Sequence, residues 1–194
     1  NGIRFYGEQI SNVRTAAVGI WVKAGSATEL DSENGLSHFL EHLFFKGTER
    51  RSYRQIAQEF DNMGIQSNAY TSKEMTCYYA RCLDSHLDRC LELLCDMIFH
   101  SRFDQKDVEL ERGVILEEID MYEDTPEDLV SERLSAAVYK GSALGRPILG
   151  KAATLEKMSG DWLREYHRTH YVPGSIVVSL AGNFTQKTVD ELKS

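Results

Sequence analysis

Apolar and polar positions follow two different periods along this chain, and the changes of period predict its elements. Where apolar residues alternate with polar ones, or run together with β-branched and aromatic residues, we expect strands; where they recur every three or four positions, we expect helices. The predicted strands cover residues 3–9, 13–23, 65–82 (with a turn at 73–74) and 176–182. The predicted helices cover residues 34–45, 52–63, 84–100, 104–122, 126–140, 154–170 (broken at Gly160) and a last segment starting near 185.

The order of these elements predicts the fold class. The first two strands are joined at residues 10–12, and the strand 176–182 returns after a series of helices. Late strands that return beside early ones favour an α+β fold, with a mainly antiparallel sheet and helices packed on it. No repeat, low-complexity tract or long linker interrupts the pattern, so we expect residues 1–194 to form a single domain.

Composition and charge narrow the classes of partner. Of 194 residues, 42% are apolar and 27% are charged, which predicts a packed core. The net charge of −8 argues against nucleic acid, because phosphate binding needs a basic face. It suits a basic peptide substrate, although many proteins are simply acidic. No apolar run approaches the roughly 18–20 residues that cross a bilayer, so we expect no membrane partner.

Two further features bear on the compartment. Residues 1–5 show no charged leader followed by an apolar stretch, so we expect no secretory signal there. Cys77, Cys82, Cys90 and Cys95 lie in one region without a C-x-x-C pair. A zinc site or disulfides would be one interpretation. We favour free thiols, because Cys77 and Cys82 are an odd number of positions apart on a predicted strand and so face opposite sides. A bacterial cytoplasm fits both features, and a trimmed organelle protein would look the same.

The pentad His38-Phe39-Leu40-Glu41-His42 makes the most specific chemical suggestion. On a helix, His38 and His42 are separated by about 40° of rotation, and Glu41 lies about 60° from His38 on the other side. Both imidazoles can therefore reach one metal ion, while Glu41 stays off the metal and contacts its water. This H-x-x-E-H order inverts the H-E-x-x-H zinc motif. The alternative is a helix whose polar residues are merely solvated.

A third ligand must come from another segment, and residues 109–119 offer several carboxylates. Glu111 and Glu118 are seven positions apart and nearly aligned on one helical face, whereas Glu117 points about 100° away from Glu118. Spacing alone does not decide between them.

Several segments together resemble the pitrilysin-type (M16) zinc peptidases, which include mitochondrial processing peptidase, insulin-degrading enzyme and bacterial processing-peptidase-like proteins. The resemblance covers essentially the whole chain and implies the fold of the LuxS/M16-like metalloenzymes, with this chain as the N-terminal catalytic half. It is carried by residues 35–48, 68–71, 145–150 and 171–175, and by Glu111 and Glu118.

The resemblance implies a role for each residue of the site. His38, His42 and Glu118 would bind Zn²⁺, and Glu41 would be the general base that takes a proton from the attacking water and passes it to the leaving amine. Glu111 would be a partner of the site that orients a histidine.

The resemblance also implies the partners. Asn68, Ala69 and Tyr70 would hold an extended peptide, or a segment of an unfolded protein, as an added strand. Family enzymes have two related halves, and the second supplies an arginine–tyrosine pair for the substrate carbonyl. No such pair can be assigned here, so we expect a second homologous half or subunit, as in a dimer. Without it, the chain is expected to cleave poorly.

An alternative from another class is a scaffold subunit that binds peptides or a partner without turnover. Such family members tend to lose the zinc residues, and this sequence keeps all of them. Two other signals are weaker. The segment Gly145 to Lys151 imitates a phosphate loop, but Ala152 replaces the Ser/Thr that would hold Mg²⁺. His167 and His170 lack a nearby acidic partner and are expected to be surface or cap residues.

Overall fold

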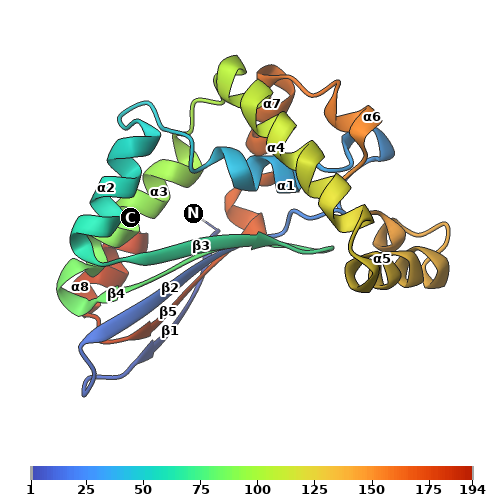
Figure 1. Ribbon diagram of the computed structural model, residues 1–194. Helices are drawn as coiled ribbons and strands as arrows, with labels where there is room; N and C mark the ends of the chain where they lie inside the picture. Colours follow the sequence, from blue (N-terminus) through green and yellow to red (C-terminus); the bar gives the residue numbers. More distant parts are fainter. Residues whose placement is uncertain (1, 194) are drawn as a thin grey trace.

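The structure is a computed structural model that describes residues 2–193, and its helices lie mainly over one face of a single sheet (Figure 1). The strands are β1 (Arg4–Gln9), β2 (Thr15–Val22), β3 (Gln66–Thr71), β4 (Thr76–Leu83) and β5 (Ile176–Gly182). The α-helices are α1 (Leu36–Leu43), α2 (Tyr53–Met63), α3 (Leu87–Phe99), α4 (Gln105–Glu123), α5 (Pro126–Val138), α6 (Ala152–Leu155), α7 (Gly160–His170) and α8 (Gln186–Lys193). Short 3-10 turns lie at η1 (Asp31–Glu33), η2 (Asp84–His86), η3 (Ala143–Gly145) and η4 (Pro173–Ser175).

The sheet has the strand order β1-β5-β2-β4-β3. The pairings β2–β4, β2–β5 and β3–β4 are antiparallel, and β1 pairs with β5 in parallel. The prediction of a mainly antiparallel α+β fold is therefore confirmed. The link at residues 10–12 joins two strands that are not neighbours, because the late strand β5 lies between them. The edge strand β3 is the strand of the sheet nearest to the site described below.

The core lies between the sheet and the helices. On β2, Val18, Ile20 and Val22 alternate toward the helices and are at most 2% exposed. They belong to the same hydrophobic core as the apolar side of α1, where Phe39 and Leu40 are fully buried. Figure 1 shows α1, α2, α3 and α7 on this side of the sheet. The short helix α1 is therefore fixed by its own apolar residues, which leaves its polar residues to face α4 and β3.

The opposite face of the sheet carries aromatic side chains. Tyr70 makes edge contacts with Trp21 and Tyr79, at ring-centroid distances of 6.3 Å in both cases. Cys77 lies on this face and Cys82 on the helical face, and both are buried. All four cysteines are free thiols, as predicted.

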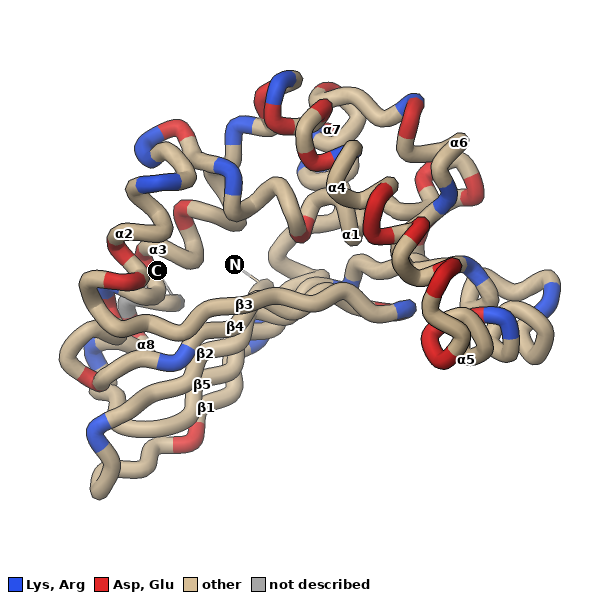
Figure 2. The backbone as a smooth tube through the Cα atoms, in the orientation of Figure 1, with Lys and Arg blue, Asp and Glu red and all other residues tan. Residues whose placement is uncertain are grey.

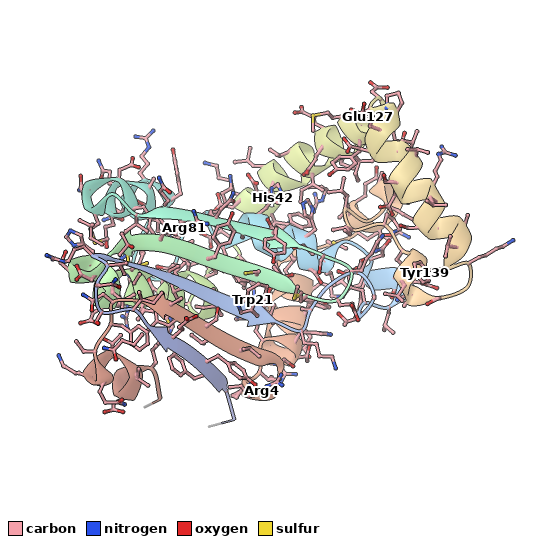
Figure 3. The ribbon with its side chains drawn as sticks, turned by 90° about the horizontal axis from the view of Figure 1, so that it is seen from below. Arg4, Trp21, His42, Arg81, Glu127 and Tyr139 are labelled. Carbon is pink, nitrogen blue, oxygen red and sulfur yellow. The ribbon has the colours of Figure 1, made fainter. Side chains whose placement is uncertain are left out.

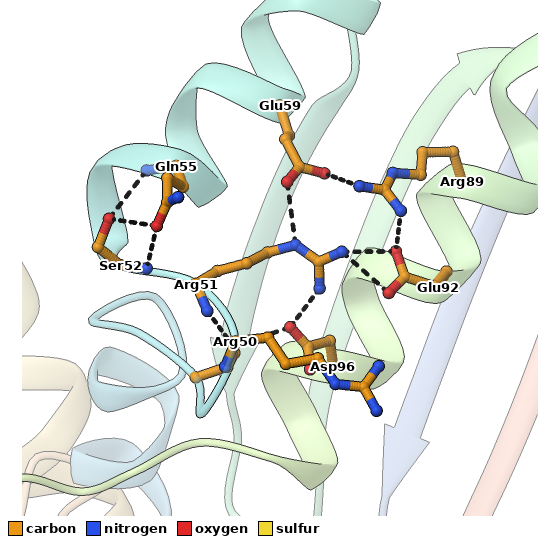
Figure 4. Close-up of polar contacts among 9 residues, drawn as sticks. Arg50, Arg51, Ser52, Gln55, Glu59, Arg89, Glu92 and Asp96 are labelled. Atoms are coloured by element: carbon orange, nitrogen blue, oxygen red, sulfur yellow. Dashed lines mark hydrogen bonds and ion pairs between the residues drawn. The ribbon is translucent and has the colours of Figure 1, made fainter.

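A charge network fixes α2 against α3 (Figure 4). The guanidinium of Arg51 contacts Glu59 at 3.0 Å, Glu92 at 2.9 Å and the buried Asp96. Arg89 contacts both Glu59 and Glu92. Because Arg51 lies just before Ser52, the N-cap of α2, and Asp96 lies on α3, the network joins the start of α2 to α3.

The helix α5 projects beyond the sheet, and none of its residues is buried. Figure 3, seen from below, labels Glu127 and Tyr139 near its two ends. Lys73, in the turn between β3 and β4, contacts Glu132 of α5 at 3.1 Å. This contact ties α5 to the sheet. None of the described helices is long and apolar enough to cross a membrane.

Candidate metal centre

The N-terminus of α1 is capped by a residue outside the helix and packs closely against a distant loop. Its N-cap residue is Gly35, with φ at +105°, which has no side chain that could cap the helix. Instead the buried carboxylate of Glu29 accepts hydrogen bonds from the backbone N–H groups of Gly35 (2.8 Å) and Ser37 (2.7 Å). A Cβ on Gly150 would lie 2.5 Å from the carbonyl oxygen of Asn34. The loop with Gly150, which imitates a phosphate loop in sequence, therefore packs against the start of α1.

The structure brings His38, His42 and Glu118 together. Their possible ligand atoms all lie within 4.8 Å of one another, and α4 supplies Glu118 across from α1. Nε2 of His38 and Nε2 of His42 each lie 3.6 Å from Oε2 of Glu118. Seen from below, His42 lies next to the edge strand β3 (Figure 3).

This donor set fits a zinc ion. Two imidazole nitrogens and one carboxylate oxygen are common protein ligands of catalytic zinc, which keeps a further position open. Ligand atoms at about 2.1 Å from a tetrahedral zinc are about 3.4 Å apart, close to the distances between both imidazoles and Glu118. Glu117, which spacing left as an alternative, is exposed, whereas Glu118 is half-buried.

His42 is oriented by Glu111. Nδ1 of His42 lies 3.1 Å from Oε2 of Glu111, whose other oxygen is 2.5 Å from Nζ of Lys46. A proton on Nδ1 leaves the lone pair of Nε2 free for a metal. Burial lowers the pKa of His42, but the hydrogen bonds with Glu111 and Glu118 outweigh it and raise that pKa to about 9. Burial also raises the pKa of Glu111, yet its contacts with His42 and Lys46 leave it lowered.

His38 is held in a different way. Its side chain is buried, and within residues 2–193 its Nδ1 has no hydrogen-bond partner. Burial and the neighbouring His42 lower the pKa of His38 to about 4, against the opposing effect of Glu118. The imidazole of His38 is therefore neutral at pH 7, the form that a metal ligand requires.

Glu41 lies beside the three ligands but outside them. Its Oε2 accepts a hydrogen bond of 2.5 Å from the hydroxyl of Thr71, at the end of β3. Burial raises the pKa of Glu41, and the hydrogen bond from Thr71 partly opposes this shift. A carboxylate with a raised pKa is suited to accept and return a proton.

The three residues predicted to hold a peptide lie on the edge strand β3. Asn68 and Tyr70 are exposed and Ala69 is half-buried. The backbone N–H of Ala69 donates to Oδ1 of Asn68 at 2.8 Å. Tyr70 borders the cleft of the metal centre, whereas Asn68 and Ala69 lie outside its lining.

That cleft has a volume of about 630 Å³ and runs from α1 between α4, the start of α5 and the loop 147–152. Figure 2 shows acidic residues along the second half of α4 and the start of α5. The charged residues of the lining are mostly acidic: Glu41, Glu118, Asp120, Glu123 and Glu132, with Lys151.

Sequence reasoning assigned no role to two residues that support the site, Glu29 at the start of α1 and Thr71 beside Glu41. Neither belongs to a metal-binding pattern, and each acts through a contact distant in sequence. The histidines that were set aside lie elsewhere, since Nε2 of His167 lies 2.8 Å from the carbonyl oxygen of Ile98 and Nδ1 of His170 lies 3.0 Å from that of Tyr166.

Two imidazoles and a carboxylate around one point, with another carboxylate beside them, are typical of hydrolytic zinc sites. The sequence profile of the Insulinase (Peptidase family M16) family matches residues 4–152. The chain therefore belongs to peptidase family M16, as the resemblance implied.

Relatives by sequence include zinc proteases and processing peptidases. The Bacillus subtilis protein "Uncharacterized zinc protease YmxG" is 48% identical over 193 residues, which are 100% of this chain and 47% of that protein. Rat "Mitochondrial-processing peptidase subunit beta" is 41% identical over 192 residues, which are 99% of this chain and 39% of that protein. The chain thus spans less than half the length of these relatives.

Solved structures share the fold. A protease from Helicobacter pylori superposes with a TM-score of 0.92 at 24% identity, covering 99% of this chain and 46% of that one. A peptidase M16 inactive domain from Pseudomonas fluorescens gives a TM-score of 0.91 at 17% identity, covering 98% of this chain and 47% of that one. The fold alone therefore does not separate an active domain from an inactive one.

Proposed function

We propose that this chain is the zinc-binding half of an endopeptidase that hydrolyses peptide bonds of extended peptides. The observation that carries the proposal is the convergence of His38, His42 and Glu118, with Glu41 held beside them by a separate hydrogen bond. Membership of the M16 family and relatives named zinc proteases support it.

The residues of this chain divide the chemistry among them. A zinc ion held by His38, His42 and Glu118 would lower the pKa of a water molecule and polarise the scissile carbonyl. Glu111 orients the ring of His42 through Nδ1. Glu41 accepts a proton on its carboxylate and returns it to the leaving amine.

Substrate binding is proposed for the edge strand β3. An extended peptide adds to such an edge through main-chain hydrogen bonds. The N–H of Ala69 is engaged by the side chain of Asn68, so a peptide that uses this N–H must displace Oδ1 of Asn68. The acidic lining of the cleft favours peptides with basic side chains near the cleaved bond.

The rest of the machinery is proposed to come from a second homologous half or subunit. Relatives are more than twice as long as this chain. A donor for the developing oxyanion would come from that half, and loss of such a donor costs about 10²–10³ in rate. The scaffold alternative loses support because the ligand set and Glu41 are all present. The expected compartment, a bacterial cytoplasm, stays a prediction.

The experiment is cleavage of a quenched fluorescent peptide by the full-length, zinc-loaded protein and by its Glu41→Gln variant. Glu41→Gln is isosteric and leaves His38, His42 and Glu118 in place, so we expect full zinc content and loss of cleavage. Glu117→Gln is the matched control, because Glu117 is an exposed carboxylate of α4. Cleavage by Glu41→Gln at the wild-type rate would refute the proposed role.

A further inference from the structure

Thr71 is the residue that contacts the proposed general base from outside the metal-binding helix. It ends the edge strand β3, and its hydroxyl donates a 2.5 Å hydrogen bond to Oε2 of Glu41 on α1. Hydrogen bonds from a hydroxyl to a carboxylate are about 2.5–2.7 Å long and stronger than those between neutral groups. The contact therefore joins the end of a strand to a single carboxylate oxygen.

The contacts around Thr71 direct its one hydroxyl proton toward Glu41. A threonine hydroxyl has one proton to donate. Thr71 has a second hydroxyl nearby, Oγ1 of Thr76 at 3.3 Å, but the proton of Thr76 goes to the carbonyl oxygen of Ala24 at 2.8 Å. The shorter, charge-assisted contact takes the proton of Thr71. Its single proton is therefore directed at Glu41, and Thr76 does not depend on Thr71 for a partner.

The position of Thr71 is fixed from two sides. In the sheet, Thr71 is paired with Thr76 on β4. In the turn that follows, the backbone N–H of Ser72 donates to the carbonyl oxygen of Met75 at 2.8 Å, and Lys73 contacts Glu132 of α5. A donor held this firmly loses little conformational entropy when it binds a carboxylate.

We propose that Thr71 is a positioning residue for Glu41, an inference that rests on the proposed function. By occupying Oε2, its hydroxyl fixes the side-chain rotamer of Glu41 beside the metal ligands. Without this hydroxyl, only the weaker contribution of the Thr71 backbone remains at Glu41, so the carboxylate can turn toward the metal as an additional ligand or away into the cleft. Either movement removes the base from the attacking water, and a misplacement of about 1 Å can cost about 10²-fold in rate.

The test compares Thr71→Val, Thr71→Ser and Thr15→Val in the full-length, zinc-loaded protein. Valine keeps the β-branched shape that suits a strand but removes the donor, whereas serine keeps the donor. Thr15→Val makes the same chemical change on β2, at an exposed position. We expect Thr71→Val to lower kcat roughly 10- to 100-fold with KM within about twofold. The kcat of Thr71→Ser should stay within about threefold of the wild-type value, and the kcat of Thr15→Val should equal that of wild type.

Zinc affinity, measured by competition with a chromogenic chelator, gives a readout apart from activity. It should not be weaker for Thr71→Val than for wild type. The inference is overturned if Thr71→Val keeps its kcat, if serine fails to rescue, or if zinc affinity falls together with kcat. A wild-type protein that cleaves nothing would instead refute the proposed function. In that case a crystal structure of zinc-loaded Thr71→Val still decides the inference, because an unmoved Glu41 carboxylate would refute it.

Discussion

Replacing Glu111 by leucine removes the acceptor that orients one of the proposed zinc ligands. Glu111 is 4% exposed and bridges Nδ1 of His42 and Nζ of Lys46. Leucine is similar in size but offers no acceptor, so Nδ1 of His42 is left without a partner. The ring can then turn, and its Nε2 no longer points steadily at Glu118.

The magnitude follows from the kind of contact that is lost. Removing a partner that orients a metal-bound histidine typically weakens metal affinity 10- to 100-fold, or about 1.4–2.7 kcal/mol. Glu111→Gln keeps an acceptor oxygen but loses the charge. A hydrogen bond to a charged group exceeds a neutral one by about 1 kcal/mol, so we expect a roughly fivefold loss for glutamine.

The assay is a zinc competition titration of the purified protein at pH 7.5, with far-UV circular dichroism to verify folding. Lys46→Met is the matched control, since it removes the other partner of Glu111 without touching His42. Its effect on zinc affinity should be smaller than that of Glu111→Leu. The reasoning is refuted if Glu111→Leu binds zinc within twofold of wild type, or if Lys46→Met costs as much.

Two further predictions concern Glu118 and His167. Glu118→Gln should weaken zinc binding far more than Glu117→Gln does, because Glu118 lies 3.6 Å from both imidazoles and Glu117 is exposed. The zinc competition titration measures both affinities, and equal losses would contradict the ligand assignment. Burial lowers the pKa of His167 below its ordinary value, against the opposing contact with the carbonyl of Ile98. The unfolded chain therefore binds the proton first as pH falls below about 6.5, and the free energy of unfolding decreases with acidification. His167→Gln should flatten this dependence between pH 7 and 5 in urea unfolding curves, and an unchanged slope would show that another group causes it.

The local elements were predictable, but the strand order was not. The predicted helices and strands occur, mostly with ends that differ by a few residues; for example, α1 ends at Leu43 rather than at residue 45. The break expected at Gly160 lies at residues 156–159 instead, because Gly160 begins α7. Periodicity is a property of neighbouring residues, so a sequence reveals it. The insertion of β5 between β1 and β2 depends on which strands pair across more than 150 residues of chain, and no local pattern encodes it.

In the candidate site, too, the residues that are close in sequence were predictable, and those that depend on long-range packing were not. His38, Glu41 and His42 share one helix face by spacing alone, so the sequence placed them together. Spacing left Glu111, Glu117 and Glu118 open, because the sequence does not say which side of α4 faces α1. Burial in the structure separates the exposed Glu117 from the other two.

The two imidazoles of the centre are held by opposite means, one by burial and the other by hydrogen bonds to carboxylates. Burial keeps His38 neutral, whereas hydrogen bonds with Glu111 and Glu118 raise the pKa of His42 to about 9. At neutral pH a proton on His42 therefore supplies the positive charge between two carboxylates that would otherwise repel each other. A zinc ion that binds Nε2 of His42 must displace a proton, so zinc binding and proton release are coupled at this ring. In the proposed zinc-bound site, the positive charge of the ion would take the place of that proton between the two carboxylates.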